Sequence, residues 1–418
     1  MVEKKTDIPI QTPDEVLEKS KEAIKNAKVF IYSGGCTSNW LDGQQIMDFL
    51  TANGHKIVHE PKEADVVVVN TCSVDEIAER GSFKKIDALK NINPKAKIII
   101  SGCLPEATDK EISNAVCLPP KKLEEFDSIF DHPNKSILDF ERPTKVNAPP
   151  YWTSIEKYFS GDAESFKKIF GFKDEEIEYM TGLNENAFII ETNQGCLGNC
   201  SYCAIRRSRG DLKSISLKRA VESFKVGLDR GYKDFKIWGD DVGDYGKDIG
   251  TDLSVLLVEF LKNKRDFKLE VLATNPNSFL ELYDKLLPSL KDKRMDCLNI
   301  TVQSGSEKIL EAMHRKIDMK LLTEKIKNLR KEAPHLNLRS HYMVGFPGET
   351  KEDFEETIKF MFETKIFQGL IFEFDAKPGT EAAQMKNQVP DEIKKERRAL
   401  IEAISKWGAA EYYGGEIY

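Results

Sequence analysis

The residues best suited to chemistry are three cysteines in one short loop, Cys196, Cys200 and Cys203. Their CxxxCxxC spacing directly follows a strand-like run, and three thiolates this close together can bind one iron–sulfur cluster. A 4Fe-4S cluster has four irons, so a three-cysteine loop leaves one iron open to an external ligand. A zinc knuckle is the alternative, but zinc prefers four tetrahedral ligands and no fourth ligand lies nearby in the sequence. We therefore interpret the loop as the binding site of a 4Fe-4S cluster.

Three more cysteines stand at the ends of short β-rich runs in the first quarter of the chain. The runs and their cysteines are residues 28–36 with Cys36, 64–72 with Cys72, and 96–103 with Cys103. Helical patterns separate these apolar runs, which indicates a parallel sheet covered on both faces. Ligands of such sheets lie beyond the carboxyl ends of the strands, so the three cysteines should converge at one edge. Free cysteines are often buried small hydrophobes instead, but each of these occupies a loop just after its strand. The convergence predicts a second cluster with an open iron.

Length, charge and cysteine count limit the class of protein. The 418 residues are enough for two or three domains. The chain has no apolar signal segment and no apolar run of membrane length, so its eight cysteines are typical of metal ligands in a cytoplasmic protein. Cys117 and Cys297 lack the loop setting of the other six and are interpreted as structural. The net charge of −7 argues against a general nucleic-acid binder, although it is compatible with a local basic groove.

The elements that position the cysteines are predicted to form two α/β domains. An N-terminal parallel α/β sheet domain spans residues 28–133, and a second domain spans residues 187–389. An N-terminal extension with a helical pattern (1–27), a linker (134–186) and a C-terminal helical tail (390–418) complete the chain. In the second domain, six strand-like runs alternate with helical patterns, which indicates an open (β/α)6 partial TIM barrel. The six runs are residues 187–191, 235–238, 268–274, 298–303, 337–344 and 369–374.

Polar and glycine-rich segments follow the predicted barrel strands. Active sites of parallel barrels lie at the carboxyl ends of the strands, and glycine there permits close approach of the backbone to a ligand. Asp240 and Asp241 follow the second strand, and Gln303 and Ser304 follow the fourth. These side chains could bond to ribose hydroxyls or to an aminocarboxylate group.

With both cysteine triads placed, the chain resembles the radical S-adenosylmethionine methylthiotransferases from Lys28 to about Ile404. The N-terminal triad resembles that family's own N-terminal domain, which sets it apart from other radical enzymes. Further similar segments are Ser208-Arg-Gly, residues 240–250, Thr274-Asn-Pro and Val302-Gln-Ser-Gly-Ser. Within the family, these segments are most similar to the archaeal and eukaryotic branch. That branch acts on threonylcarbamoyladenosine in tRNA, beside the anticodon.

The resemblance implies two 4Fe-4S clusters and S-adenosyl-L-methionine as cofactors. The cluster on Cys36, Cys72 and Cys103 would carry sulfur, and the cluster on the second triad would generate the radical that opens an unactivated C–H bond. General acid or base groups cannot open such a bond at neutral pH, so we expect no catalytic side chain of that kind. The expected cofactor contacts are Tyr202, Gly239, Asp240, Asp241, Thr274, Gln303, Ser304, Arg339 and Gly345.

Basic residues next to the second triad are the expected substrate contacts. Arg206, Arg207 and Arg209 could meet the phosphates of a nucleic acid, with Trp238 or Tyr245 available for base stacking. A solvated basic loop is the alternative interpretation.

Two features depart from the family pattern. Family members usually end in a small β-barrel that binds RNA, whereas the residues after Val389 have a helical pattern, so we expect no such barrel in this sequence. His341 occupies a position where the family pattern has an acidic residue.

These observations favour methylthiolation of a tRNA adenosine. The same chemistry on a polypeptide, either a ribosomal protein or a ribosomally made peptide, is the alternative, which the acidic balance and the expected lack of a barrel support. A third class, a cluster-bearing scaffold or electron carrier, would not need an open iron twice. We expect an electron donor such as flavodoxin or ferredoxin and no membrane partner.

Overall fold

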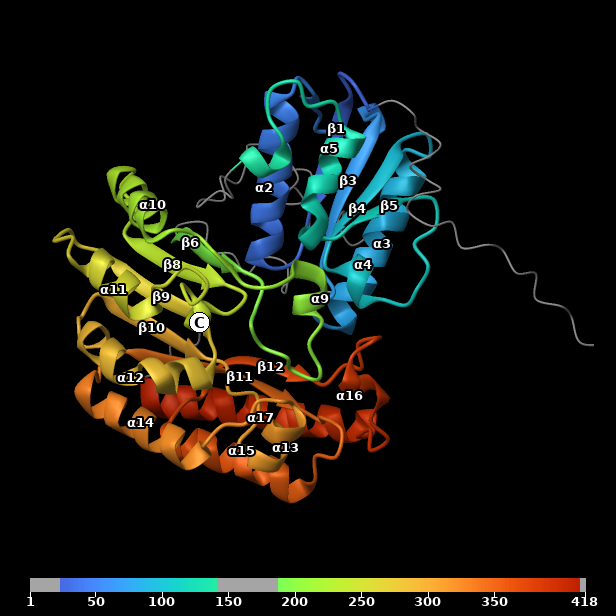
Figure 1. Cartoon of the computed structure of the whole chain (residues 1–418). Coiled ribbons are helices and arrows are strands. Elements are labelled where there is room, and N and C mark those ends of the chain that lie inside the picture. The colour runs from blue at the N-terminus through green and yellow to red at the C-terminus, as the bar shows by residue number, and fades with distance from the viewer. Residues whose placement is uncertain (1–22, 141–186, 414–418) are drawn as a thin grey trace, which may run out of the picture.

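The structure is a computed structural model that describes residues 23–140 and 187–413 (Figure 1). The described residues form two α/β units, each built around its own sheet. Most of the predicted N-terminal extension and most of the predicted linker lie outside the described residues. In Figure 1 the N-terminal unit is blue to green and the second unit is green to red, and the short helix α9 (Ile205–Arg209) lies where the two units meet.

The N-terminal sheet has five parallel strands in the order β2-β1-β3-β4-β5. Residues Val66 and Val68 of β3 pack into one core, and Val67 and Val69 pack into another. Both faces of the sheet are therefore covered, as the continuous apolar runs predict. The strands are β1 (Lys28–Ser33), β2 (Lys56–Ile57), β3 (Val66–Thr71), β4 (Lys97–Gly102) and β5 (Val116–Leu118). Strands β2 and β5 escape prediction because two or three residues carry too little periodicity.

Short and long helices connect and cover these strands. They are α2 (Thr37–Ala52), η1 (Pro61–Glu63), α3 (Glu76–Ile92), α4 (Leu104–Ala107), η2 (Pro120–Glu125), α5 (Phe126–Ile129) and η3 (Ile137–Asp139). Helix α3 begins at an Asp75 cap whose carboxylate accepts from Ala78 N, which satisfies one of the unpaired amides of the first turn.

The second sheet has seven strands in the order β12-β11-β10-β9-β8-β6-β7. The six strands other than β7 are parallel and follow one another in chain order, while β7 pairs antiparallel with β6 at the edge. Among the described residues, β7 and β12 do not pair with each other, so the predicted open (β/α)6 partial barrel is confirmed. The strands are β6 (Ala187–Gln194), β7 (Lys213–Ser214), β8 (Asp234–Gly239), β9 (Lys268–Thr274), β10 (Met295–Ile300), β11 (Asn337–Val344) and β12 (Gln368–Glu373).

The largest error in the predicted strands concerns β10. The sequence predicts a strand over 298–303, but the strand begins at Met295 and ends at Ile300. Gln303 has a φ of +76° and keeps only an isolated bridge to Tyr342, so its backbone has left the regular ladder.

Helices cover the outside of the barrel and enclose one large apolar core. Besides α9 they are α10 (Leu217–Asp229), η4 (Val242–Asp244), α11 (Leu253–Leu261), α12 (Pro276–Leu290), α13 (Glu307–Ala312), α14 (Met319–Glu332), α15 (Lys351–Thr364), α16 (Glu381–Gln384) and α17 (Asp391–Tyr413). Helix α17 is the helical pattern predicted after Val389, and it packs against β12 and β11. Its Arg397 pairs with Glu349 at 2.5 Å.

The carboxyl edges of the two sheets face each other. Trp238 Nε1, at the end of β8, donates to Ser38 Oγ at the start of α2 over 2.8 Å. Lys377 Nζ, after β12, lies 3.2 Å from Glu79 Oε2 in α3 and 2.7 Å from Asp375 Oδ2. The loops that carry both cysteine triads therefore meet in the space between the two units.

Candidate functional site

The structure brings Cys36, Cys72 and Cys103 together at the carboxyl edge of the N-terminal sheet. They follow β1, β3 and β4, which are neighbouring strands. Two glycines with positive φ permit the close approach of these loops. A Cβ atom on Gly35 would lie 2.3 Å from Cys72 Cβ, and one on Gly102 would lie 2.1 Å from the carbonyl oxygen before Cys72. Any side chain at either glycine would push the cysteine loops apart.

Burial dominates the electrostatics of this first triad, and the positive charge of Arg209 opposes it at Cys36 and Cys103. Burial raises the pKa of all three thiols, that of Cys72 to about 12. The Cys36 charge further raises the pKa of Cys72, and Cys36 and Cys72 both raise the pKa of Cys103. The thiols of Cys36 and Cys72 therefore lie close enough for their charges to affect their neighbours in the triad. A metal cluster binding there would displace their protons, and soft sulfur ligands suit iron–sulfur chemistry.

The second triad, Cys196, Cys200 and Cys203, lies in the single loop after β6. A Cβ atom on Gly198 would lie 3.1 Å from Cys196 Sγ and 3.8 Å from Cys200 Sγ, so both sulfurs face this glycine. Backbone amides reach two of the sulfurs, because Gly198 N donates to Cys196 Sγ at 3.1 Å and Ile205 N donates to Cys203 Sγ at 3.4 Å. Amide donors of this kind stabilise cluster thiolates, so the donor set fits a cluster with three protein ligands.

Two carboxylates adjoin the second triad. Ligand atoms of Asp241, Asp244 and Cys196 lie within 4.8 Å of one another. Burial, followed by the Asp244 charge, raises the pKa of Asp241 to about 7. The amides of Gly243 and Asn275 donate to Asp241 Oδ1 at 3.1 and 3.2 Å and hold it in place. These carboxylates can accept hydrogen bonds from the amino or hydroxyl groups of a ligand beside the second triad.

Two of the expected cofactor contacts have buried side-chain oxygens that could bond to a ligand. Thr274 Oγ1 and Gln303 Oε1 are buried and have no hydrogen-bond partner among the described residues. An unpaired buried polar atom is costly, and a ligand that bonds to it removes that cost. Tyr202 differs, because its hydroxyl already accepts from Arg315 Nη1 at 3.1 Å.

Two other expected cofactor contacts have side-chain neighbours within the protein, and their role in cofactor binding stays a prediction. Ser304 Oγ lies 3.4 Å from Thr357 Oγ1 of α15, and Arg339 Nη1 lies 3.5 Å from Glu270 Oε2 within the barrel. Asp240 accepts from Gly195 N at 2.7 Å through its Oδ2. The last two expected contacts are glycines that make room for neighbouring side chains. A Cβ on Gly239 would meet Asn193 Oδ1 at 2.4 Å, and one on Gly345 would meet Lys394 Cγ at 2.3 Å.

Arg315 is a site residue that the sequence analysis misses. Its guanidinium is buried, its Nη2 donates to Thr301 Oγ1 at 3.3 Å, and its Nε has no partner among the described residues. Burial by itself lowers the pKa of Arg315, but the charges of Tyr202, Cys200 and Asp241 outweigh burial and raise it. A buried cation beside the second triad suits a carboxylate ligand. No local motif marks this arginine, so the sequence gives no signal for it.

The three arginines predicted to contact phosphates have different surroundings. Arg209 is buried and pairs with Asp42, so it cannot reach a phosphate at the surface, which corrects that prediction. Arg207 donates to the carbonyl oxygens of Pro378, at 2.7 Å, and of Glu106. Arg206 remains exposed and pairs with the exposed Asp211, at 2.7 Å.

The two predicted stacking residues are also restrained. Tyr245 is completely buried, so it cannot stack on a base, and that prediction is wrong. Trp238 is partly exposed, with its indole nitrogen bonded to Ser38.

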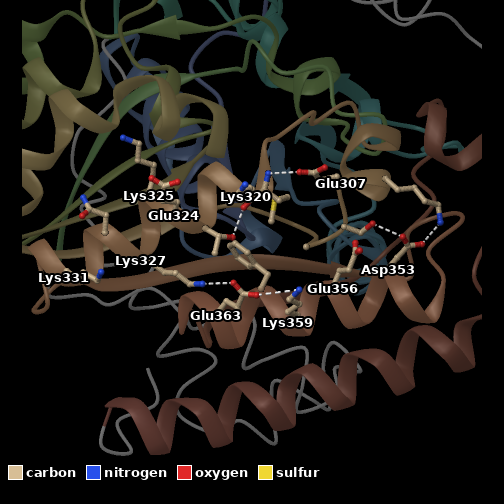
Figure 2. A pocket seen from close by; sticks show the side chains of 17 residues that line it. Glu307, Lys320, Glu324, Lys325, Lys327, Lys331, Asp353, Glu356, Lys359 and Glu363 are labelled. Atoms are coloured by element: carbon tan, nitrogen blue, oxygen red, sulfur yellow. Dashed lines mark hydrogen bonds and ion pairs between the residues drawn. The ribbon is translucent and has the colours of Figure 1, made fainter.

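A groove on the outside of the barrel is separate from both triads (Figure 2). It has a volume of about 1230 Å³ and is lined mainly by α14 and α15. Its lysines alternate with acids, as where Lys327 and Lys359 both pair with Glu363, at 2.7 and 3.8 Å. None of the predicted site residues lines this groove. We therefore do not assign this groove to the candidate site.

Comparisons with known proteins agree with this geometry. Residues 28–118 match the Uncharacterized protein family UPF0004, and residues 190–361 match the Radical SAM superfamily. Among solved structures, the radical S-adenosylmethionine methyltransferase TsrM from Kitasatospora setae is similar in fold. Its TM-score is 0.56 at 13% identity, over 86% of this chain and 77% of that one.

Two curated relatives cover most of the chain. The "Probable threonylcarbamoyladenosine tRNA methylthiotransferase" of Pyrococcus horikoshii is 32% identical over 380 residues, which are 90% of this chain and 83% of the relative. The "Ribosomal protein uS12 methylthiotransferase RimO" of Clostridium botulinum is 31% identical over 386 residues, 90% of this chain and 80% of the relative.

The fold and the second cysteine triad define a radical S-adenosylmethionine enzyme. The chain belongs to the radical S-adenosylmethionine methylthiotransferases, which are transferases that use S-adenosyl-L-methionine and two 4Fe-4S clusters. No helix of the described residues is long and apolar enough to span a membrane.

Proposed function

We propose that this protein attaches a methylthio group to an adenosine of tRNA, with threonylcarbamoyladenosine beside the anticodon as the substrate. The structural observation that supports the methylthiolation is the meeting of two cysteine triads between two sheets. The proposed substrate is supported by the similarity to the "Probable threonylcarbamoyladenosine tRNA methylthiotransferase" of Pyrococcus horikoshii, which extends over 90% of this chain. A cytoplasmic location is part of the same proposal.

In this proposal the two triads hold the two clusters. Cys36, Cys72 and Cys103 would bind the first cluster, and the triad after β6 would bind the second. When bound, the clusters and S-adenosylmethionine supply the sulfur and the radical that opens the C–H bond. The N-terminal unit, residues 28–133, and the barrel, residues 187–389, each present one triad to the space between them.

Side chains of the barrel orient S-adenosylmethionine in this proposal. Arg315 offers a buried cation to the carboxylate of the cofactor, and Asp241 offers a carboxylate to its amino group. Thr274 and Gln303 have acceptor atoms without partners among the described residues, which suit ribose hydroxyls. The burial of these four side chains strengthens each of these contacts.

A polypeptide substrate is the second candidate, and the arginines after the second triad favour it. Arg207 and Arg209 use their guanidinium groups inside the protein, so this helix presents only Arg206 to a polyanion. The relative from Clostridium botulinum is named as a ribosomal protein methylthiotransferase. In either case we expect a low-potential electron donor such as flavodoxin or ferredoxin.

Mass spectrometry separates the two candidates. Nucleosides from tRNA and peptides from the proteome are compared between cells with and without this gene. The proposal expects a methylthio mass gain in one adenosine nucleoside only when the protein is present. A gain confined to a peptide would establish the second candidate, and a gain in neither pool would contradict both.

A further inference from the structure

Arg209, at the end of α9, links the two units through one buried guanidinium group. Its side chain is only 1% exposed. Nη2 donates to Asn39 Oδ1 at 2.9 Å and to Asp42 Oδ2 at 2.8 Å, and Nε lies 3.6 Å from Asp240 Oδ1. Asn39 and Asp42 belong to α2, whereas Asp240 follows β8 of the barrel. One side chain therefore bonds to both units at once.

The partners on the N-terminal side hold the loops of the first triad. Asn39 Nδ2 donates to the carbonyl oxygen two residues before Cys36, at 3.0 Å, and to the one directly before Cys72, at 2.8 Å. The residue next to the arginine, Ser208, donates its hydroxyl to the carbonyl oxygen of Cys103 at 3.3 Å. Two consecutive residues of α9 therefore contact, directly or through Asn39, all three loops of that triad.

The partner on the barrel side holds the second triad. Asp240 Oδ2 accepts from Gly195 N at 2.7 Å, directly before Cys196. This carboxylate therefore holds the backbone at the start of the loop that carries the second triad, while its Oδ1 faces Arg209. Arg209 itself stands six residues after Cys203.

An ion pair that served only to join the two units would not need to lie beside the cysteine loops. Apolar contacts join surfaces at lower desolvation cost than a buried charge does. Arginine offers several donors in one rigid plane, so it fixes the relative orientation of two partners better than a lysine can. The guanidinium group of Arg209 contacts Asn39 and Asp240, whose side chains bond to the backbone of the loops that carry the two triads.

We infer that Arg209 is a positioning residue that sets the separation of the two cysteine triads, and that transfer of the methylthio group depends on this separation. The inference rests on the proposed assignment of the triads to the two clusters. It predicts a specific failure when the link is weakened. Both clusters and the cleavage of S-adenosylmethionine should persist, while the product formed per cleavage event falls.

The test compares Arg209→Lys with a surface control, Arg265→Lys, whose exposed side chain pairs with Asp229 at 2.7 Å. Both proteins are reconstituted with iron and sulfide under anaerobic conditions. We measure 5′-deoxyadenosine and methylthiolated product in the same reaction. Displacement of reacting groups by about 1 Å can reduce rates by about 100-fold, so the ratio of product to 5′-deoxyadenosine should fall about 10- to 100-fold in Arg209→Lys only.

Two readouts report on position rather than activity. The magnetic interaction between the two reduced clusters, measured by electron paramagnetic resonance, should change in Arg209→Lys and not in Arg265→Lys. In the metal-free proteins, amide hydrogen exchange in residues 36–45 and 205–212 should be faster for Arg209→Lys. A double variant, Arg209→Gln with Asp42→Asn, removes two of the buried charges together, so it tests the same link with less risk of misfolding.

The outcomes distinguish this inference from the proposed function. If the wild-type protein lacks the second cluster or forms no methylthiolated product, the proposed function fails. If the wild type is active and both Arg209 variants keep its product ratio and its cluster interaction, the positioning role is wrong. A loss of 5′-deoxyadenosine equal to the loss of product would also overturn it, because the link would then serve radical formation.

Discussion

The two cysteine triads reach similar environments by different routes. Cys196, Cys200 and Cys203 lie in one loop after one strand, so their proximity follows from a spacing of a few residues. The first triad collects one cysteine from each of three neighbouring strands, and about thirty residues separate successive members. The second triad is therefore a local structure, whereas the first exists only when a parallel sheet has formed.

The difference implies different sensitivities. A local loop keeps its spacing if the surrounding sheet is strained, because the chain itself limits the distances between ligands. A triad made by topology depends on strand order and on tight packing between loops. The glycines at 35 and 102, where a side chain would collide with the neighbouring cysteine loop, show how little tolerance remains there.

Removing one triad at a time should have the largest effect and should separate the roles of the two triads. Cys196/Cys200/Cys203→Ala should release no 5′-deoxyadenosine, while Cys36/Cys72/Cys103→Ala should still release it and form no methylthiolated product. Iron analysis should fall from about eight to about four irons per chain in each variant, because each triad holds one 4Fe-4S cluster.

Each of these variants must first show the absorbance of its remaining cluster and a cooperative thermal transition. Methylthiolated product from the variant that lacks the first triad would show that those three cysteines are structural. About four irons in the unmodified protein would exclude a cluster at both triads.

Gly102→Ala should damage the first triad selectively. Its φ of +84° and the predicted collision with backbone at 2.1 Å should lower the free energy of unfolding by roughly 3 kcal/mol or more. The first cluster should be lost and the second kept. The control is Gly231→Ala, at a φ of +87° with nothing within 4 Å, which should cost only about 1 kcal/mol. Urea unfolding and iron analysis measure both effects, and full iron content in Gly102→Ala would contradict the tight-packing argument.

The stability of the second unit at low pH should depend on His341 of β11. Burial, followed by the positive charge of Arg315, lowers the pKa of His341 to about 4, and Asn299 Nδ2 lies 3.1 Å from its Nε2. The unfolded chain, with an ordinary histidine pKa near 6.5, binds more protons between these values. Stability should therefore fall as pH decreases from about 6.5 to about 4, by about 1–3 kcal/mol.

His341→Gln should remove this part of the pH dependence. Urea unfolding of the metal-free proteins between about pH 8 and about pH 4.5 measures it. An equal decline in the wild type and the variant would mean that other groups cause the loss.

The smallest expected effect concerns Arg206, the exposed arginine of α9. If tRNA contacts this helix, Arg206→Gln should weaken binding a few-fold and reduce the slope of log K against log salt by about one. Arg265→Gln, at an exposed ion pair elsewhere, serves as the control. An unchanged slope would show that tRNA does not use this helix and would favour a polypeptide substrate.

Much of the architecture could be predicted because it depends on short-range patterns. Strands β9 and β11 have the predicted bounds, and their residues largely alternate between buried and more exposed positions, which is the two-residue period of a strand. The errors concern side chains that could contact either a ligand or the rest of the protein. Tyr245 and Arg209 look available in the sequence and are buried in the fold. Arg315 shows the converse, because nothing near it in the sequence marks a buried cation.

The sequence by itself determined the second triad, the parallel strands that end in the first triad, and the class of chemistry. These features follow from ligand spacing and from hydrophobic periodicity, which act over a few residues. Only the tertiary structure decided how the triads face each other, because Asn39, Arg209 and Asp240 come from three distant segments. Their pairing depends on burial, which lowers the local dielectric and makes a charge without a partner costly. That cost is a property of the packed interior, so no local pattern in the chain can express it.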